Sequence, residues 1–254
     1  MEKPSYTNQY RNSNIENPIG PEMFPIRKQI ILFVVGWFGL QIIATVIQYL
    51  LVGANVIIGN KQNYNLSILT NALGYIALCT TLLLISNKDL IRLTPSFKKY
   101  KSYIAGIVCF LSILAFSYVY SLLLYVLKIN TTENANQTSL DNVSAKYFFT
   151  SLIVFGIIAP ICEELTYRVG LFSLCRRRSK TFAYIVPPLV FALIHFNLDL
   201  SSTKAFLNEV LNLPHYIFAG LAFSFTYDKF GFAGSVSAHI INNVLSLTIF
   251  TLIL

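Results

Sequence analysis

The second half of the chain contains side chains that could together hydrolyse a peptide bond. They are polar or ionisable and fall in three short motifs, EExxxR, FxxxH and HxxxN: Glu163, Glu164, Arg168, His195, His239 and Asn243. A carboxylate in a cavity with little water can act as a general base, and a nearby histidine can hold the water that it activates. A second histidine and an amide can donate hydrogen bonds to the oxyanion of a tetrahedral intermediate. This set therefore predicts peptide hydrolysis without a serine or cysteine nucleophile.

A zinc site is the chemical alternative for the same residues. Glu163, His195 and His239 form a His₂Glu set of ligands, which leaves one position on Zn²⁺ open for water. The sequence contains no HExxH, and the two histidines fall in different predicted helices. We expect a reaction without a cofactor, and the spacing leaves zinc as the alternative.

Purely structural roles also account for some of these residues. Glu164 and Arg168 are four apart, so they share a helical face and could neutralise each other. Glu163 lies about 100° further round the helix and cannot share that contact. Asn243, taken alone, could form a hydrogen bond to a neighbouring helix. His215, which follows Pro214, is expected to be structural or interfacial.

The composition places these residues in a membrane. The chain has 55% hydrophobic and 12% charged residues with a mean hydropathy of +0.60, whereas a soluble domain carries about 25% charged residues. Ionisable groups inside a membrane are costly and usually mark a functional site. The net charge of +8 comes largely from short loops beside the apolar stretches. We therefore expect membrane lipid and a peptide or protein substrate as partners, and no nucleic acid.

The fold class expected is an all-α polytopic membrane protein with the active site inside the bundle. Seven apolar stretches are predicted to span the membrane, at about 30–52, 66–86, 103–127, 147–175, 181–198, 209–227 and 231–254. Segment 201–212 could add an eighth, partial helix. The polar stretch 128–146 is predicted to be a loop between three spans without a motif (27–128) and a catalytic core of four helices (147–254).

The basic residues predict the orientation of the chain. If the polar segment 1–26 is a cytoplasmic tail, fourteen Lys and Arg residues fall in inner segments and four in outer segments, as the positive-inside rule requires. With a rise of about 1.5 Å per residue, Glu163, His195 and Asn243 lie roughly 18, 21 and 18 Å from the inner ends of their spans. The three motifs are therefore predicted to meet at overlapping depth, from the middle to the inner half of the membrane.

The order, spacing and helix placement of the three motifs resemble those of the CPBP family, which contains CAAX proteases and bacteriocin-processing enzymes and is also called Abi. The resemblance covers roughly residues 147–250 and implies an intramembrane glutamic endopeptidase. It implies that Glu163 activates water with help from His195, that His239 and Asn243 form the oxyanion hole, and that Glu164 and Arg168 position the site.

Several biological roles are compatible with the predicted chemistry. The resemblance allows CAAX-type cleavage, pheromone or bacteriocin peptide processing, or self-immunity. A membrane immunity factor or scaffold without catalysis is the non-enzymatic alternative. The Asn-, Ile- and Lys-rich composition favours a bacterial origin, so we expect a multi-pass protein of the plasma membrane. The sequence defines neither the substrate nor an oligomeric state.

Overall fold

The computed structural model describes residues 24–53, 64–132, 134–198 and 202–253, and within these residues the protein is helical without strands. Most of the predicted tail, residues 1–23, lies outside the described residues. The helices in chain order are α1 (Ile26–Gly53), α2 (Tyr64–Ser86), α3 (Thr94–Phe97), α4 (Tyr100–Val126), α5 (Ala135–Lys146), α6 (Phe148–Ile153), α7 (Ala159–Glu164), α8 (Ser173–Arg178), α9 (Lys180–Leu193), α10 (Thr203–Phe230) and α11 (Phe232–Ile253).

Helices α6, α7 and α8 are parts of one continuous helical stretch, Phe148–Arg178. Two π-helical segments, Val154–Ile158 and Leu165–Phe172, join them. A π-helical segment widens the helix and leaves carbonyl groups out of the regular pattern, and such segments are frequent at functional sites. Here they lie on either side of the EE pair, which ends α7.

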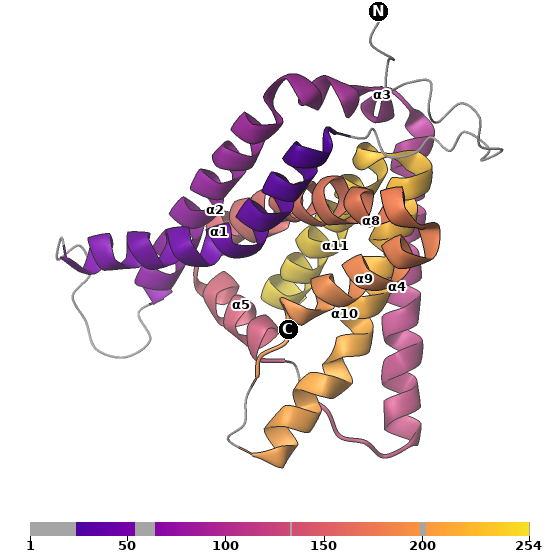
Figure 1. Ribbon diagram of the computed structural model, residues 1–254. Helices are drawn as coiled ribbons and strands as arrows, with labels where there is room; N and C mark the ends of the chain where they lie inside the picture. The colour runs from indigo at the N-terminus through magenta and orange to yellow at the C-terminus, as the bar shows by residue number, and fades with distance from the viewer. Residues whose placement is uncertain (1–23, 54–63, 133, 199–201, 254) are drawn as a thin grey trace, which may run out of the picture.

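The helices form two groups around this central stretch. Helices α1 and α2 pack together as a pair on one side, and α4 and α10 pack against α11 on the other (Figure 1). Helix α11 also contacts α7, and α1 contacts Leu165–Phe172. Gly231, with a φ of +79°, ends α10 and lets α11 start at once, because glycine adopts this left-handed conformation without strain.

Small residues allow α1 to approach the central stretch closely. A Cβ atom added to Gly36 would overlap the side chain of Thr166, and one added to Gly170 would lie 3.0 Å from the Phe33 nitrogen. Helices in membranes commonly associate through such small residues, because backbones can then come together. The crossing places α1 beside the turn of helix that follows Glu163.

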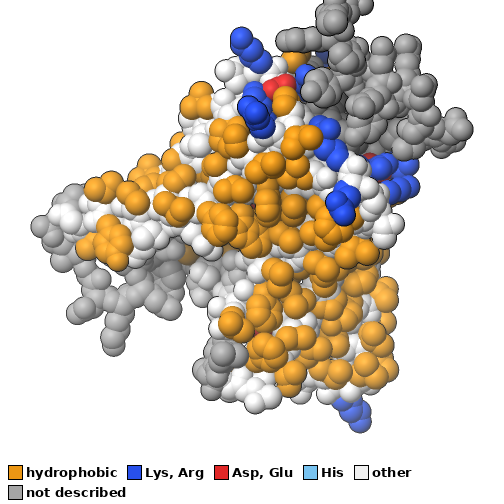
Figure 2. All heavy atoms as spheres, in the orientation of Figure 1, with side chains coloured by type: hydrophobic (Ala, Val, Ile, Leu, Met, Phe, Trp, Pro, Cys, Tyr) orange, Lys and Arg blue, Asp and Glu red, His pale blue; other side chains and the backbone are white. Residues whose placement is uncertain are grey.

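Several of the predicted spans are confirmed as long apolar helices. Five candidate membrane spans occur among the described residues: Ile26–Gly53, Leu66–Arg92, Tyr100–Val126, Phe148–Arg178 and Phe232–Ile249. Hydrophobic side chains cover most of the visible body, and Lys and Arg side chains gather mainly at the end where α1 begins (Figure 2). These helices indicate a multi-pass membrane protein. The total of seven spans and the orientation of the chain stay predictions.

The structure corrects the predicted elements of the second half of the chain in three places. Stretch 128–146 is not simply a loop, since it contains α5, whose first turn is capped by Asn134. The predicted span 181–198 is only 14 residues long as α9, about 21 Å at the usual helical rise. Segment 201–212 forms no separate partial helix, because residues from Thr203 onward belong to α10. The first prediction was wrong because the stretch is polar, and the second because apolar residues continue past the end of α9, at Ile194, Phe196 and Leu198.

Ion pairs fix the basic end of the bundle. Arg176 lies 3.1 Å from Asp228, to which the Tyr184 hydroxyl also donates, and Lys28 lies 2.6 Å from Asp89. The charges that the sequence assigned to inner loops therefore also tie the long central stretch to α10, and α1 to the end of α2.

Candidate active site

Glu164 and Arg168 form a completely buried ion pair at the centre of the molecule. Arg168 Nε lies 3.3 Å from Glu164 Oε2, and both side chains have no exposed surface. The guanidinium group also stacks over the rings of Phe191 and Phe223, at 4.8 and 5.4 Å from their centroids. These aromatic faces favour a cation, so the arginine charge is held by a carboxylate and two rings.

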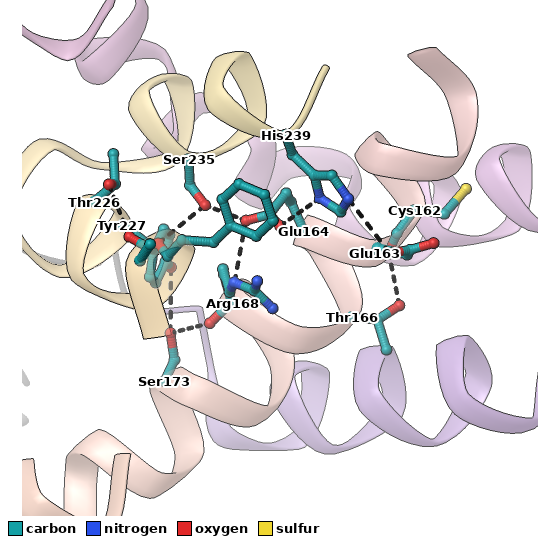
Figure 3. Close-up of polar contacts among 12 residues, drawn as sticks. Cys162, Glu163, Glu164, Thr166, Arg168, Ser173, Thr226, Tyr227, Ser235 and His239 are labelled. Atoms are coloured by element: carbon teal, nitrogen blue, oxygen red, sulfur yellow. Dashed lines mark hydrogen bonds and ion pairs between the residues drawn. The ribbon is translucent and has the colours of Figure 1, made fainter. Parts of the chain in front are cut away.

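Glu164 has two further partners, both from α11. The Ser235 hydroxyl donates to Oε2, and His239 Nδ1 lies 3.0 Å from Oε1 (Figure 3). Ser235 and His239 are four residues apart, so one face of α11 presents both. With three partners on its two oxygens, Glu164 is committed to holding α11 and Arg168 in place.

Glu163 points away from this cluster, as the angle between neighbouring helical positions predicts. Its Oε2 lies 3.6 Å from His239 Nε2, and its side chain is 15% exposed where that of Glu164 is completely buried. Figure 3 shows the His239 ring between the two carboxylates. The two adjacent glutamates therefore have different surroundings: one holds the structure, and the other faces open space.

That space is a cavity of about 310 Å³, and it brings the three motifs together. Glu163, His195 and Asn243 all line it. His239 is only 4% exposed and reaches the cavity through its contact with Glu163. The sequence placed His239 beside Asn243 as a second oxyanion donor, and the structure places it between the carboxylates.

His195 is not carried by a helix. Helix α9 ends at Leu193, and the ring lies in the following loop, stacked on Tyr216 with centroids 4.4 Å apart. Asn136 Nδ2 lies 3.3 Å from its Nδ1. The i,i+4 relation to Phe191 survives the end of the helix, since the two rings are 5.1 Å apart.

Asn243 is oriented by two hydrogen bonds. Its Nδ2 donates to the Phe155 carbonyl at 3.0 Å, and its Oδ1 accepts from Asn242 Nδ2 at 3.3 Å. Phe155 lies in the first π-helical segment, where carbonyl groups leave the regular helical pattern. One N–H of the Asn243 amide is used in this way, and the second remains for the cavity.

Residues that precede the motifs also line the cavity, although this part of the chain carries no motif. Trp37 and Gln41 come from α1, Asn71 and Tyr75 from α2, and Ser139 from α5. Sequence reasoning missed these residues and Ser235. The Ser235–His239 spacing of four was a usable signal, whereas nothing in the sequence placed α1, α2 or α5 against the motifs. His215, which hydrogen-bonds Ser117 and packs against Phe116 and Tyr120, has the structural contacts expected of it.

The proposed zinc ligands Glu163, His195 and His239 do not form a metal-holding group in this arrangement. Among the residues that the structure describes, no group of three His, Cys, Asp or Glu side chains could hold a metal ion. Asn136 is the neighbour of His195 Nδ1, and Glu164 is the neighbour of His239 Nδ1. Whether the reaction depends on a metal stays a prediction for experiment.

Comparison with known proteins supports the motif resemblance. An uncharacterized protein of Mycoplasma capricolum subsp. capricolum is 28% identical over 170 residues, which cover 62% of this chain. The alignment covers 47% of that relative, so the chain spans about half the length of the protein it matches. No solved structure matches the chain. Residues 145–245 match the family described as type II CAAX prenyl endopeptidase Rce1-like, and this segment contains all six motif residues. Residues 145–245 are therefore similar to the Rce1-like family of CAAX proteases.

Proposed function

We propose that this protein is an intramembrane endopeptidase in which Glu163 activates the attacking water. The family match supports the coarser assignment, a membrane protease. The observation that carries the finer proposal is the single cavity on which Glu163, His195 and Asn243 converge, with the Glu164–Arg168 pair buried behind it.

Glu163 is the carboxylate that fits the role of general base. Glu164 is occupied by Arg168, Ser235 and His239, whereas Glu163 faces the cavity. In the proposed reaction Glu163 takes a proton from water, and the water oxygen bonds to the substrate carbonyl carbon. The carbonyl electron pair moves to its oxygen. When the tetrahedral intermediate collapses, the C–N bond breaks and Glu163 returns the proton to the leaving nitrogen.

Asn243 is the proposed donor to the oxyanion. Its amide is fixed before substrate arrives, by the Phe155 carbonyl and by Asn242. A donor that needs no reorganisation during the reaction stabilises the developing charge more than a mobile one. His239 is the proposed second donor, from Nε2, and Glu164 orients its ring from behind through Nδ1, as a carboxylate does behind a catalytic histidine.

The cavity favours an uncharged stretch of peptide around the bond that is cut. Apart from Glu163 and His195, the side chains that line it are neutral, and several can hydrogen-bond a peptide backbone, such as Gln41, Asn71 and Tyr75. The matching family is described as a type II CAAX prenyl endopeptidase. A CAAX-type substrate is therefore the first to test, with an unmodified membrane-associated peptide as the second.

The test uses purified protein in lipid bilayers and two quenched fluorescent CAAX peptides, one farnesylated and one unmodified. Glu163→Gln keeps the size of the side chain but removes the base, so we expect turnover to fall by at least about 100-fold. Cleavage that survives both Glu163→Gln and His195→Gln would overturn the proposal. A cellular phenotype that persists in these variants would instead favour the scaffold or immunity role.

A further inference from the structure

His195 lies where its own helix cannot position it. Helix α9 ends at Leu193, and the His195 N–H makes a turn-type hydrogen bond to the Ala192 carbonyl at 3.1 Å. A catalytic side chain must be held within about 0.5 Å of its working position. A loop residue therefore needs support from elsewhere in the fold.

The first turn of α5 gives this support. Asn134 Nδ2 donates to the His195 carbonyl at 2.9 Å, and Asn136 Nδ2 lies 3.3 Å from Nδ1 of the ring. The ring is stacked on Tyr216 of α10, at 4.4 Å between centroids and 11° between planes. The backbone, one ring nitrogen and one ring face of His195 are thus each in contact with a different side chain.

The start of α5 is itself anchored. Buried Glu209 of α10 accepts from the Ala135 N–H through Oε1 at 2.9 Å and from the Asn197 N–H through Oε2 at 3.1 Å. One carboxylate therefore joins α5, the loop after His195, and α10. Glu209 is only 5% exposed, so these hydrogen bonds are largely protected from solvent.

Hydrogen bonds define how the amides of Asn134 and Asn136 are oriented. Asn134 Nδ2 donates to a carbonyl and its Oδ1 accepts from the Gln137 N–H, so its orientation is defined. The Tyr216 hydroxyl must then give its one proton to Asn134 Oδ1, at 3.2 Å. Asn136 points its NH₂ group at the ring of His195, with Nδ2 3.3 Å from Nδ1.

This orientation also fixes the proton on His195. An NH₂ group beside Nδ1 requires that Nδ1 accept, and a neutral imidazole then carries its proton on Nε2. We propose that Asn136 is a positioning residue of the active site, which holds the His195 ring and keeps its proton on Nε2. From there His195 donates a hydrogen bond into the cavity, to the oxygen of water or substrate, and Glu163 alone is the base.

This inference rests on the proposed function for its catalytic consequence, but not for the contact itself. Asn134 and Asn136 precede the segment 145–245 that matches the family. They lie in the polar stretch that the sequence presents as a loop. The active site therefore extends into α5, outside the part of the chain that carries the motifs.

Nuclear magnetic resonance of histidine side chains tests the contact without a substrate. The chain has three histidines, so protein labelled with ¹⁵N-histidine gives three pairs of ring nitrogen signals, which His→Gln variants assign. We expect the protonated-type signal of His195 on Nε2. Asn136→Asp puts an acceptor beside Nδ1, so we expect the proton to move to Nδ1. Asn142→Ala and Asn142→Asp are matched controls, since Asn142 is an exposed asparagine on the same helix.

Activity on the farnesylated and unmodified CAAX peptides tests the consequence. We expect Asn136→Ala and Asn136→Asp to lower kcat by about 10- to 100-fold, an effect of the size seen when the hydrogen-bond partner of a metal-ligating histidine is lost, with KM within about twofold. Asn142 variants should match the unchanged protein. Unchanged His195 signals in Asn136→Asp, or kcat equal to that of Asn142→Asp, would overturn the inference. If Glu163→Gln still cleaves while the His195 signals change as expected, the proposed function fails and the contact stands.

Discussion

Arg168 and Glu164 lie 3.3 Å apart and neither side chain reaches the surface. Removing one partner of such a pair leaves a charge buried without compensation, which usually costs about 3–5 kcal/mol. We therefore expect Arg168→Met to lower the free energy of unfolding in detergent micelles by about that amount. Arg178→Met is the control, because Arg178 is exposed at the end of the same helical stretch.

The same pair predicts partial recovery in a double variant. Glu164→Gln combined with Arg168→Met removes both charges, so its unfolding free energy should exceed that of Arg168→Met alone. If the single variant is as stable as Arg178→Met, the pair does not hold the site together.

Asn242 is expected to affect catalysis through Asn243. Asn243→Ala removes the proposed oxyanion donor, and loss of one such donor lowers kcat by about 10²–10³-fold. Asn242→Ala leaves the Asn243 donor in place but removes the hydrogen bond to Asn243 Oδ1, so we expect a smaller decrease in kcat. The measurement is kcat on the CAAX peptides. An Asn242→Ala enzyme that loses more activity than Asn243→Ala would contradict this order.

The crossing of α1 over the central stretch predicts a difference between two glycines of one helix. Gly36→Ala would place a methyl group against Thr166, which overpacks the contact and should cost about 1–3 kcal/mol. Gly53→Ala meets nothing within 4 Å and should leave stability nearly unchanged. Thermal unfolding of both variants in the same micelles provides the comparison. Equal melting temperatures would show that the close approach is not needed.

Metal dependence can be decided directly. The proposed mechanism uses a carboxylate, a histidine and an amide, so activity should persist after incubation with 1,10-phenanthroline or EDTA. Purified protein should contain no stoichiometric zinc by elemental analysis. Loss of cleavage on chelation, with recovery on added Zn²⁺, would instead favour the zinc alternative with Glu163, His195 and His239.

The chemistry was more predictable than the architecture. Intramembrane Glu, Arg and His residues stand out because lipid excludes them, and the 100° between Glu163 and Glu164 was enough to separate their surroundings. Helix lengths were less predictable, because apolar residues (Ile194, Phe196 and Leu198) continue past Leu193, where α9 stops. The prediction for 128–146 was wrong for the opposite reason. Helix α5 is polar, and only Asp141, Val143 and Ser144 are buried, so its helix depends on contacts distant in sequence.

Contacts across the two halves were beyond prediction. Trp37 and Asn71 carry no chemical signal, yet both face the cavity. Their position depends on how α1 crosses Thr166 and Gly170, and such a crossing is set by the shapes of two helices rather than by either sequence alone.

The contribution of α1, α2 and α5 to the cavity has a consequence for how this protein can be divided. A fragment of residues 147–254 would keep every motif residue, but it would lose the wall formed by Trp37, Gln41 and Asn71 and the asparagines that hold His195. Lipid chains would then meet Glu163 directly. The motif-bearing segment is therefore not a transplantable module, and grafting it onto unrelated helices would transfer the reactive groups without the chamber in which they work.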